Sequence, residues 1–126
     1  MMAVGHGWPK LKNFDSMKDD WVVPELWPFS YLTPPISLAA TIFAELGCAA
    51  LLVVGVATRP AAFVLGFAMV VAGFQKLAEN SFFLPAPGAR EPAIMYLLMC
   101  VVLVIVGAGK WSLDSQLYKE KRRKFF

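Results

Sequence analysis

The longest apolar run in the chain places the narrowest limits on its fold. It covers residues 35–57, which are 23 residues with a single charged side chain, Glu45. Two further runs, residues 60–74 and 92–109, have 15 and 18 residues and no charge. A membrane-spanning helix needs about 20 apolar residues. The first run meets this length and the others approach it, so the sequence predicts an all-α transmembrane helical bundle.

Composition supports a membrane rather than an aqueous environment. Hydrophobic residues make up 58% of the 126 residues and charged residues only 17%, whereas a soluble domain is nearer half apolar and a quarter charged. A soluble bundle of three buried helices is the alternative, but the runs lack the polar face of a surface helix. A closed barrel fits less well, because the runs are unbroken rather than alternating.

The predicted organisation is a single membrane domain. It has a helix-1 stub at 1–11, an outer loop at 12–34, spans at about 35–57, 60–78 and 92–110, and a cytoplasmic tail at 111–126. Only eight residues precede Pro9, and eight helical residues cover about 12 Å. We therefore expect earlier turns of this first helix to lie upstream of Met1.

The outer loop is rich in prolines, which exclude a long helix there. Its aromatic residues, Trp21, Trp27, Phe29 and Tyr31, are typical of a membrane interface. We interpret this segment as a loop on the outer membrane surface, with a lid over a ligand as the alternative.

Basic residues indicate the orientation. Five of the twelve Lys and Arg residues lie near the C-terminus, and such clusters stay in the cytoplasm. Topology is the first interpretation of this cluster, and contact with anionic lipid or docking of another protein are the alternatives. None of them requires nucleic acid. The basic residues assigned to topology or lipid contact are Arg59, Lys119, Lys121, Arg122, Arg123 and Lys124.

Glu45 lies near the middle of its run. An acidic residue at that depth is costly and faces the interior of a bundle. Ser37, Thr41, Glu45 and Cys48 are 4, 4 and 3 residues apart, so they form one helical stripe. The second run is expected to offer a matching line of small residues, Ala62, Gly66 and Gly73. No cation is expected near Glu45, so we predict a protonated carboxyl that is hydrogen-bonded to a hydroxyl or carbonyl group.

Several roles for these polar residues remain open. Glu45 is interpreted first as a packing device, and otherwise as a contact to a quinone-type ligand, a proton carrier or a subunit contact. His6 is expected to be structural within the bundle, and Cys48 to be a small core residue. The sequence shows no nucleophile–base pair, phosphate loop, metal-ligand set or CxxC. We therefore predict no catalytic residue, no metal site and no independent enzyme activity.

Three fragments, in this order, resemble the DoxX family of small bacterial membrane proteins. They are "GHGWPKLKNF", "AELGCAALLVVGVATRPAA" and "GAGKWSLD". The resemblance implies a four-helix bundle in the bacterial inner membrane with both ends in the cytoplasm, so helix 1 would be largely absent here. It brings no family-wide catalytic motif and no recognisable cofactor motif.

Two functional hypotheses remain, and the resemblance supports the second of them. Some family members are subunits of a thiosulfate:quinone oxidoreductase, and others associate with redox-defence enzymes. The first hypothesis is a non-catalytic accessory subunit of a larger membrane complex, with the lipid bilayer and other membrane subunits as partners. The alternative is the membrane subunit of a quinone-linked oxidoreductase, with quinone as its ligand.

Overall fold

The computed structural model describes residues 3–25, 27–76, 81–83 and 90–124. Within these ranges all regular structure is helical, as the sequence predicts. The prolines of the segment between residues 12 and 34 keep its helices short. The N-terminal part contains four short elements: η1 (Ala3–Gly7), α1 (Trp8–Lys12), α2 (Phe14–Met17) and η2 (Phe29–Tyr31).

Three consecutive elements form the first long helix: α3 (Pro34–Ile42), η3 (Phe43–Cys48) and α4 (Ala49–Val54). Together they span Pro34–Val54, which is 21 residues, and an 18-residue stretch within it has a mean hydropathy of 2.1. Proline suits the first turn, because it lacks an N–H that the helix would leave unpaired. The helix ends at Gly55, whose φ of 74° favours glycine.

The second long helix consists of α5 (Thr58–Val71) and η4 (Ala72–Lys76). Its apolar stretch, Thr58–Gln75, has 18 residues with a mean hydropathy of 1.3. Both long helices have the length and composition to cross a membrane. In the most apolar 18-residue stretch of each helix, only 33% (first helix) and 39% (second helix) is buried within the protein. The core helix of a soluble protein would be mostly buried, so this exposed apolar surface fits a lipid environment.

The third apolar run forms α6 (Glu91–Val106), a helix of 16 residues. It spans about 24 Å, less than the roughly 30 Å of a bilayer core. The helix ends earlier than the predicted limit near residue 110, because Gly107 has a φ of 85° and breaks the helical path. Residues 77–78 of the second predicted span lie outside the described residues.

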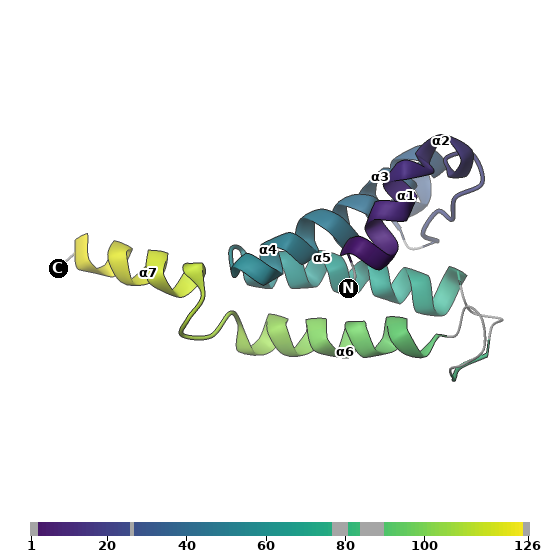
Figure 1. Ribbon diagram of the computed structural model, residues 1–126. Helices are drawn as coiled ribbons and strands as arrows, with labels where there is room; N and C mark the ends of the chain where they lie inside the picture. The colour runs from purple at the N-terminus through teal and green to yellow at the C-terminus, as the bar shows by residue number, and fades with distance from the viewer. Residues whose placement is uncertain (1–2, 26, 77–80, 84–89, 125–126) are drawn as a thin grey trace.

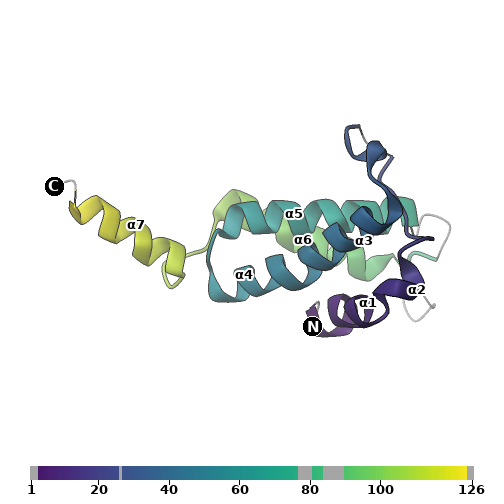
Figure 2. The same cartoon turned by 90° about the horizontal axis from the view of Figure 1, so that it is seen from above.

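α5 and α6 lie side by side, and the α3–α4 helix packs against α5 (Figures 1 and 2). A Cβ atom on Gly66 would lie 3.2 Å from Cβ of Cys100, and one on Gly73 would lie 3.6 Å from Cβ of Ala93. These glycines therefore let α6 approach α5 closely. The expected match between this line of small residues and the Glu45 stripe is wrong for Gly66 and Gly73, which face α6, whereas Ala62 packs in one core cluster with Cys48.

Hydrogen bonds join the end of α6 and the residues just after it to the turn between α4 and α5 and to the start of α5. The Asp114 carboxylate accepts hydrogen bonds from the backbone N–H groups of Thr58 and Ala57, both at 2.8 Å. The Asp114 N–H donates to the Gly55 carbonyl at 2.9 Å, and the Arg59 guanidinium donates to the Ile105 carbonyl at 3.3 Å. We call these contacts the clasp. Asp114 lies in the first turn of α7 (Leu113–Lys124), and the rest of this helix extends away from the other helices (Figure 1).

Candidate functional site

The most unusual contact in the structure joins two charged residues 35 positions apart. Lys10 of α1 forms an ion pair with Oε1 of Glu45 in η3. The two side chains are only 18% and 4% exposed. The expectation that no cation lies near Glu45 is therefore wrong, and Glu45 is the acidic partner of an ion pair rather than an isolated carboxyl.

Gly7 explains how Lys10 reaches Glu45. A Cβ atom on Gly7 would lie 2.7 Å from Cγ of Leu46 and 3.3 Å from Cβ of Glu45, so the N-terminal helix touches η3 at this point. The helix continues past Pro9 to Lys12, which places Lys10 one turn beyond Gly7 on the same face. Its ammonium therefore points toward Glu45 instead of the outer membrane surface.

A chain of hydrogen bonds continues the polar wall beside this pair. The Ser37 hydroxyl donates to the Val22 carbonyl at 2.7 Å, and the Thr41 hydroxyl donates to the Ser37 carbonyl at 2.9 Å. The Trp21 indole N–H donates to the Thr41 hydroxyl at 3.4 Å. The Lys10 ammonium also lies 5.3 Å from the Trp21 ring centroid, a cation–π distance.

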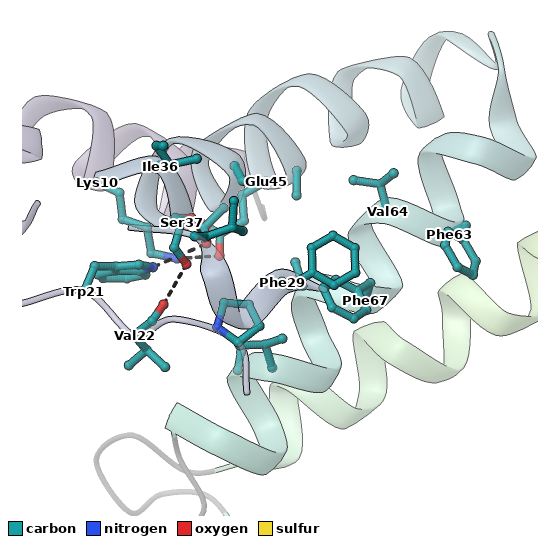
Figure 3. Close-up of a pocket in the computed structure, with 18 residues that line it drawn as sticks. Lys10, Trp21, Val22, Phe29, Ile36, Ser37, Glu45, Phe63, Val64 and Phe67 are labelled. Carbon is teal, nitrogen blue, oxygen red and sulfur yellow. Dashed lines mark hydrogen bonds and ion pairs between the residues drawn. The ribbon is translucent and has the colours of Figure 1, made fainter. Parts of the chain in front are cut away.

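These residues line one end of a cavity of about 510 Å³ between the first long helix and α5. Figure 3 shows Lys10, Trp21, Ser37 and Glu45 grouped at that end, with aromatic rings toward the other. The Phe29 and Phe67 rings are in contact, with centroids 4.9 Å apart. Small-molecule sites have volumes of about 300–1,000 Å³ and mostly apolar walls with a few polar groups. The cavity has these properties. Its apolar wall includes Pro24, Leu32, Ile36, Ala40, Phe63, Val64, Ala68 and Val71.

The cavity wall contains both buried and exposed residues. Ser37, Ala44 and Glu45 are buried, whereas Ile36 and Phe63 on the cavity wall are 53% and 67% exposed. Both exposed residues belong to helices that are long and apolar enough to span a membrane. The apolar wall of the cavity therefore reaches the side of the bundle, where lipid would lie.

The other predicted site residues are distributed unevenly. Ser37 and Thr41 line the cavity with Glu45, but Cys48 lies in the core formed with Ala44, Ala61 and Ala62. The π-helical stretch η3 explains this, because its wider turns rotate Cys48 away from the stripe. His6, which is expected to be structural within the bundle, does not line the cavity. Its side chain is exposed.

The predicted topology residues lie at the other end of the molecule. Arg59 belongs to the clasp, and Lys119 is exposed on α7. The side chains of the remaining tail residues, Lys121, Arg122, Arg123 and Lys124, lie outside the described part of the structure.

The sequence interpretation missed most of the cavity wall, including Lys10 and Trp21 at its polar end. No cation is expected near Glu45 from the sequence, and Trp21 is expected in an aromatic belt, yet Trp21 is buried. Trp27 and Tyr31 are exposed as a belt requires. The available signal was the spacing from Gly7 to Lys10, since a glycine marks a close helix approach and a residue three positions later shares its face.

Two comparisons relate the chain to other proteins. The sequence model of the DoxX family matches residues 1–75, a stretch that contains all the cavity-lining residues. An uncharacterized protein of Haemophilus influenzae is 33% identical over 88 residues, which cover 68% of this chain and 65% of that protein. The chain thus spans less than two thirds of this relative. No solved structure matches the present chain.

The family match and the helices agree. More than half of the chain matches the family, and two of its helices are long and apolar enough to cross a membrane. The chain is therefore a membrane protein of the DoxX family.

Proposed function

We propose that this protein is the membrane subunit of a quinone-linked oxidoreductase and that it holds a quinone-type molecule in its cavity. The observation that carries the proposal is an apolar cavity of about 510 Å³ that ends in the Lys10–Glu45 ion pair. An apolar wall with few polar groups is suited to a ring with an apolar tail.

The residues present fit such a molecule. The aromatic side chains of Phe29, Phe63 and Phe67 offer surfaces for a flat ring. The ammonium of Lys10 has three N–H donors, so it has hydrogen-bonding capacity beyond its contact with Glu45. A ring oxygen placed at the polar end would meet both charged residues. The exposed wall residues Ile36 and Phe63 would give a ligand dissolved in the bilayer access to the cavity.

The quinone, a partner protein and this chain would each have a separate role. A bound quinone would supply the redox chemistry, and the electrons would come from a partner protein. This chain would bind the ring, orient its oxygen at the ion pair and exclude water from it. The aromatic segment 21–32 contributes Trp21, Phe29 and Leu32 to the cavity wall and acts as the lid over the ligand.

We also propose where the protein lies and how it is oriented. The protein lies in the bacterial inner membrane as a DoxX-type four-helix bundle with its C-terminus in the cytoplasm. The basic tail supports this orientation, and the clasp would then lie at the cytoplasmic end of the helices. Lys10, Trp21 and the segment 21–32 would lie toward the periplasm.

A matched pair of substitutions tests quinone binding. Ala39 and Ala40 are adjacent, exposed residues of α3, but only Ala40 lines the cavity. We expect Ala40→Phe to fill the cavity and abolish binding of a short-chain ubiquinone analogue, measured by equilibrium dialysis in lipid nanodiscs. Ala39→Phe should bind as the unmodified protein does. Equal binding by the two variants would show that the cavity is not the quinone site.

A non-catalytic accessory subunit without a ligand is the second candidate. It is supported by α6, whose apolar side chains are largely exposed and offer a surface to another membrane protein. Under this proposal the protein should co-purify with a defined membrane partner in mild detergent, and Ala40→Phe should leave the assembly intact. Purification as a stable monomer would argue against it. The exposed residues of α6 include Met95, Leu98, Met99, Val101, Val102, Ile105 and Val106.

A further inference from the structure

The second carboxylate oxygen of Glu45 is the least satisfied group in the cavity wall. Oε1 is paired with Lys10, whereas Oε2 is buried and has no hydrogen-bond partner among the described residues. Glu45 as a whole is only 3% exposed and lines the cavity. A buried acceptor without a donor is unfavourable, so the occupant of this end of the cavity should bring a donor.

The neighbouring hydroxyl and indole groups do not meet this need. The hydroxyl of Ser37 donates to Val22, and the hydroxyl of Thr41 donates to the Ser37 carbonyl. The indole N–H of Trp21 donates to Thr41. Each of these donors is directed to a protein oxygen, which leaves Glu45 Oε2 as the open position of the network.

The charges of the wall favour a neutral ligand. Among the lining residues, Lys10 and Glu45 are the charged ones, and their charges cancel. An added cation would meet the ammonium and an added anion would meet the carboxylate. A neutral hydroxyl can satisfy both residues, because it donates to a carboxylate oxygen and accepts from the ammonium.

We propose that the cavity selects the reduced, hydroxyl-bearing form of its ligand, a hydroquinone whose O–H donates to Glu45 Oε2. This inference rests on the proposed quinone site and specifies which redox form that site holds. The oxidised form has a carbonyl at the same position, so it accepts from Lys10 but leaves Oε2 unpaired. The two forms have nearly the same shape, and their affinity ratio therefore isolates this one hydrogen bond.

The test compares four ligands with the purified protein in neutral-lipid nanodiscs under anaerobic conditions. A short-chain ubiquinol and its ubiquinone form one pair, and a long-chain phenol and its methyl ether form a second pair without redox chemistry. Binding is measured by equilibrium dialysis. We expect the donor-bearing member of each pair to bind about tenfold more tightly or better, as for a hydrogen bond to a charged acceptor.

Glu45→Gln should reverse this preference. The amide oxygen would take the place of Oε1 beside Lys10, and the amide NH₂ would replace Oε2. The open position would then be a donor, so the variant should prefer the ubiquinone and the methyl ether. Glu25→Gln is the control, because Glu25 is exposed and does not line the cavity, and it should retain the preference for donors.

The outcomes separate this inference from the proposed function. Equal affinities within each pair, or tighter binding of the ubiquinone by the unmodified protein, would overturn the inference and leave the quinone site standing. Failure of both ubiquinol and ubiquinone to bind would overturn the quinone site and the inference with it. The affinity ratio of the unmodified protein decides the matter even if the Glu45 variant does not fold.

Discussion

Gly7 lies so close to Leu46 that a Cβ atom on the glycine would be 2.7 Å from the leucine Cγ. This contact fixes the N-terminal helix against η3 and brings Lys10 over Glu45. The geometry of the ion pair thus depends on a residue that has no side chain.

Gly7→Ala should therefore loosen the N-terminal helix. We expect a loss of about 1–3 kcal/mol, the usual effect of overpacking a close contact, measured as thermal stability in detergent. Gly5→Ala is a matched control in the same element, because no atom lies within 4 Å of its added Cβ. A similar loss in both variants would show that helix composition, and not the contact with Leu46, is responsible.

Substitutions of Glu45 should differ in their effects. Glu45→Leu removes the partner of a mostly buried ammonium, which we expect to cost about 3–5 kcal/mol. Glu45→Gln keeps an acceptor for Lys10, so its loss should be smaller. The double variant Lys10→Met/Glu45→Leu should recover most of the stability, because it leaves no unpaired charge.

Denaturation of the three Glu45 variants in one detergent checks this prediction. Equal losses for Gln and Leu would contradict a structural role of the ion pair. A double variant less stable than Glu45→Leu alone would do the same.

The clasp should weaken in acid. The backbone N–H groups of Thr58 and Ala57 lower the pKa of Asp114 below its ordinary value of 3.8. A carboxylate with a lowered folded-state pKa contributes stability above its unfolded pKa and loses it as the pH falls through the folded value. The contribution should therefore be constant near neutral pH and decline only below about pH 3.8.

The comparison of the unmodified protein with Asp114→Asn measures this effect. Their difference in unfolding temperature should be steady from pH 7 to pH 5 and should shrink in stronger acid. Asp20→Asn is the control, since Asp20 is exposed and distant in sequence from the clasp. A difference that does not change with pH would show that the Asp114 charge does not hold the clasp.

The orientation predicts the behaviour of reporter fusions. A reporter that is active only in the periplasm should be silent when it is fused after Phe126. The same reporter should be active when it is inserted at the exposed Asp19–Asp20 position, on the opposite side of the membrane. Strong activity after Phe126 would reverse the topology.

The main helices could be predicted from sequence because their signals are local. The apolar runs, the prolines of the N-terminal segment and the inward position of Glu45 all appear within a single stretch of chain. The glycine that ends α6 was visible as well, but its φ of 85° was not. Residue type alone does not say which glycines break a helix and which, like Gly66, allow two helices to touch.

The ion pair and the cavity could not be predicted, because they depend on how separate segments meet. Lys10 and Glu45 are 35 residues apart. The pattern of apolar residues on one helix does not identify which other helix packs against it. The same holds for Trp21, whose composition fits an interface and a cavity wall equally well. The three fragments that resemble the family nevertheless meet in pairs: Gly7 contacts Leu46, and Asp114 contacts Thr58.

The exposure of the cavity-wall residues Ile36 and Phe63 at the side of the bundle has a consequence for every affinity measured on this protein. A ligand that arrives from the side of the bundle is sampled from the hydrocarbon phase, where an apolar molecule is far more concentrated than in the buffer. Its relevant concentration is the mole fraction in lipid, so doubling the lipid at fixed total ligand should weaken the apparent binding. Dissociation constants from different membrane mimetics become comparable only after correction for partitioning.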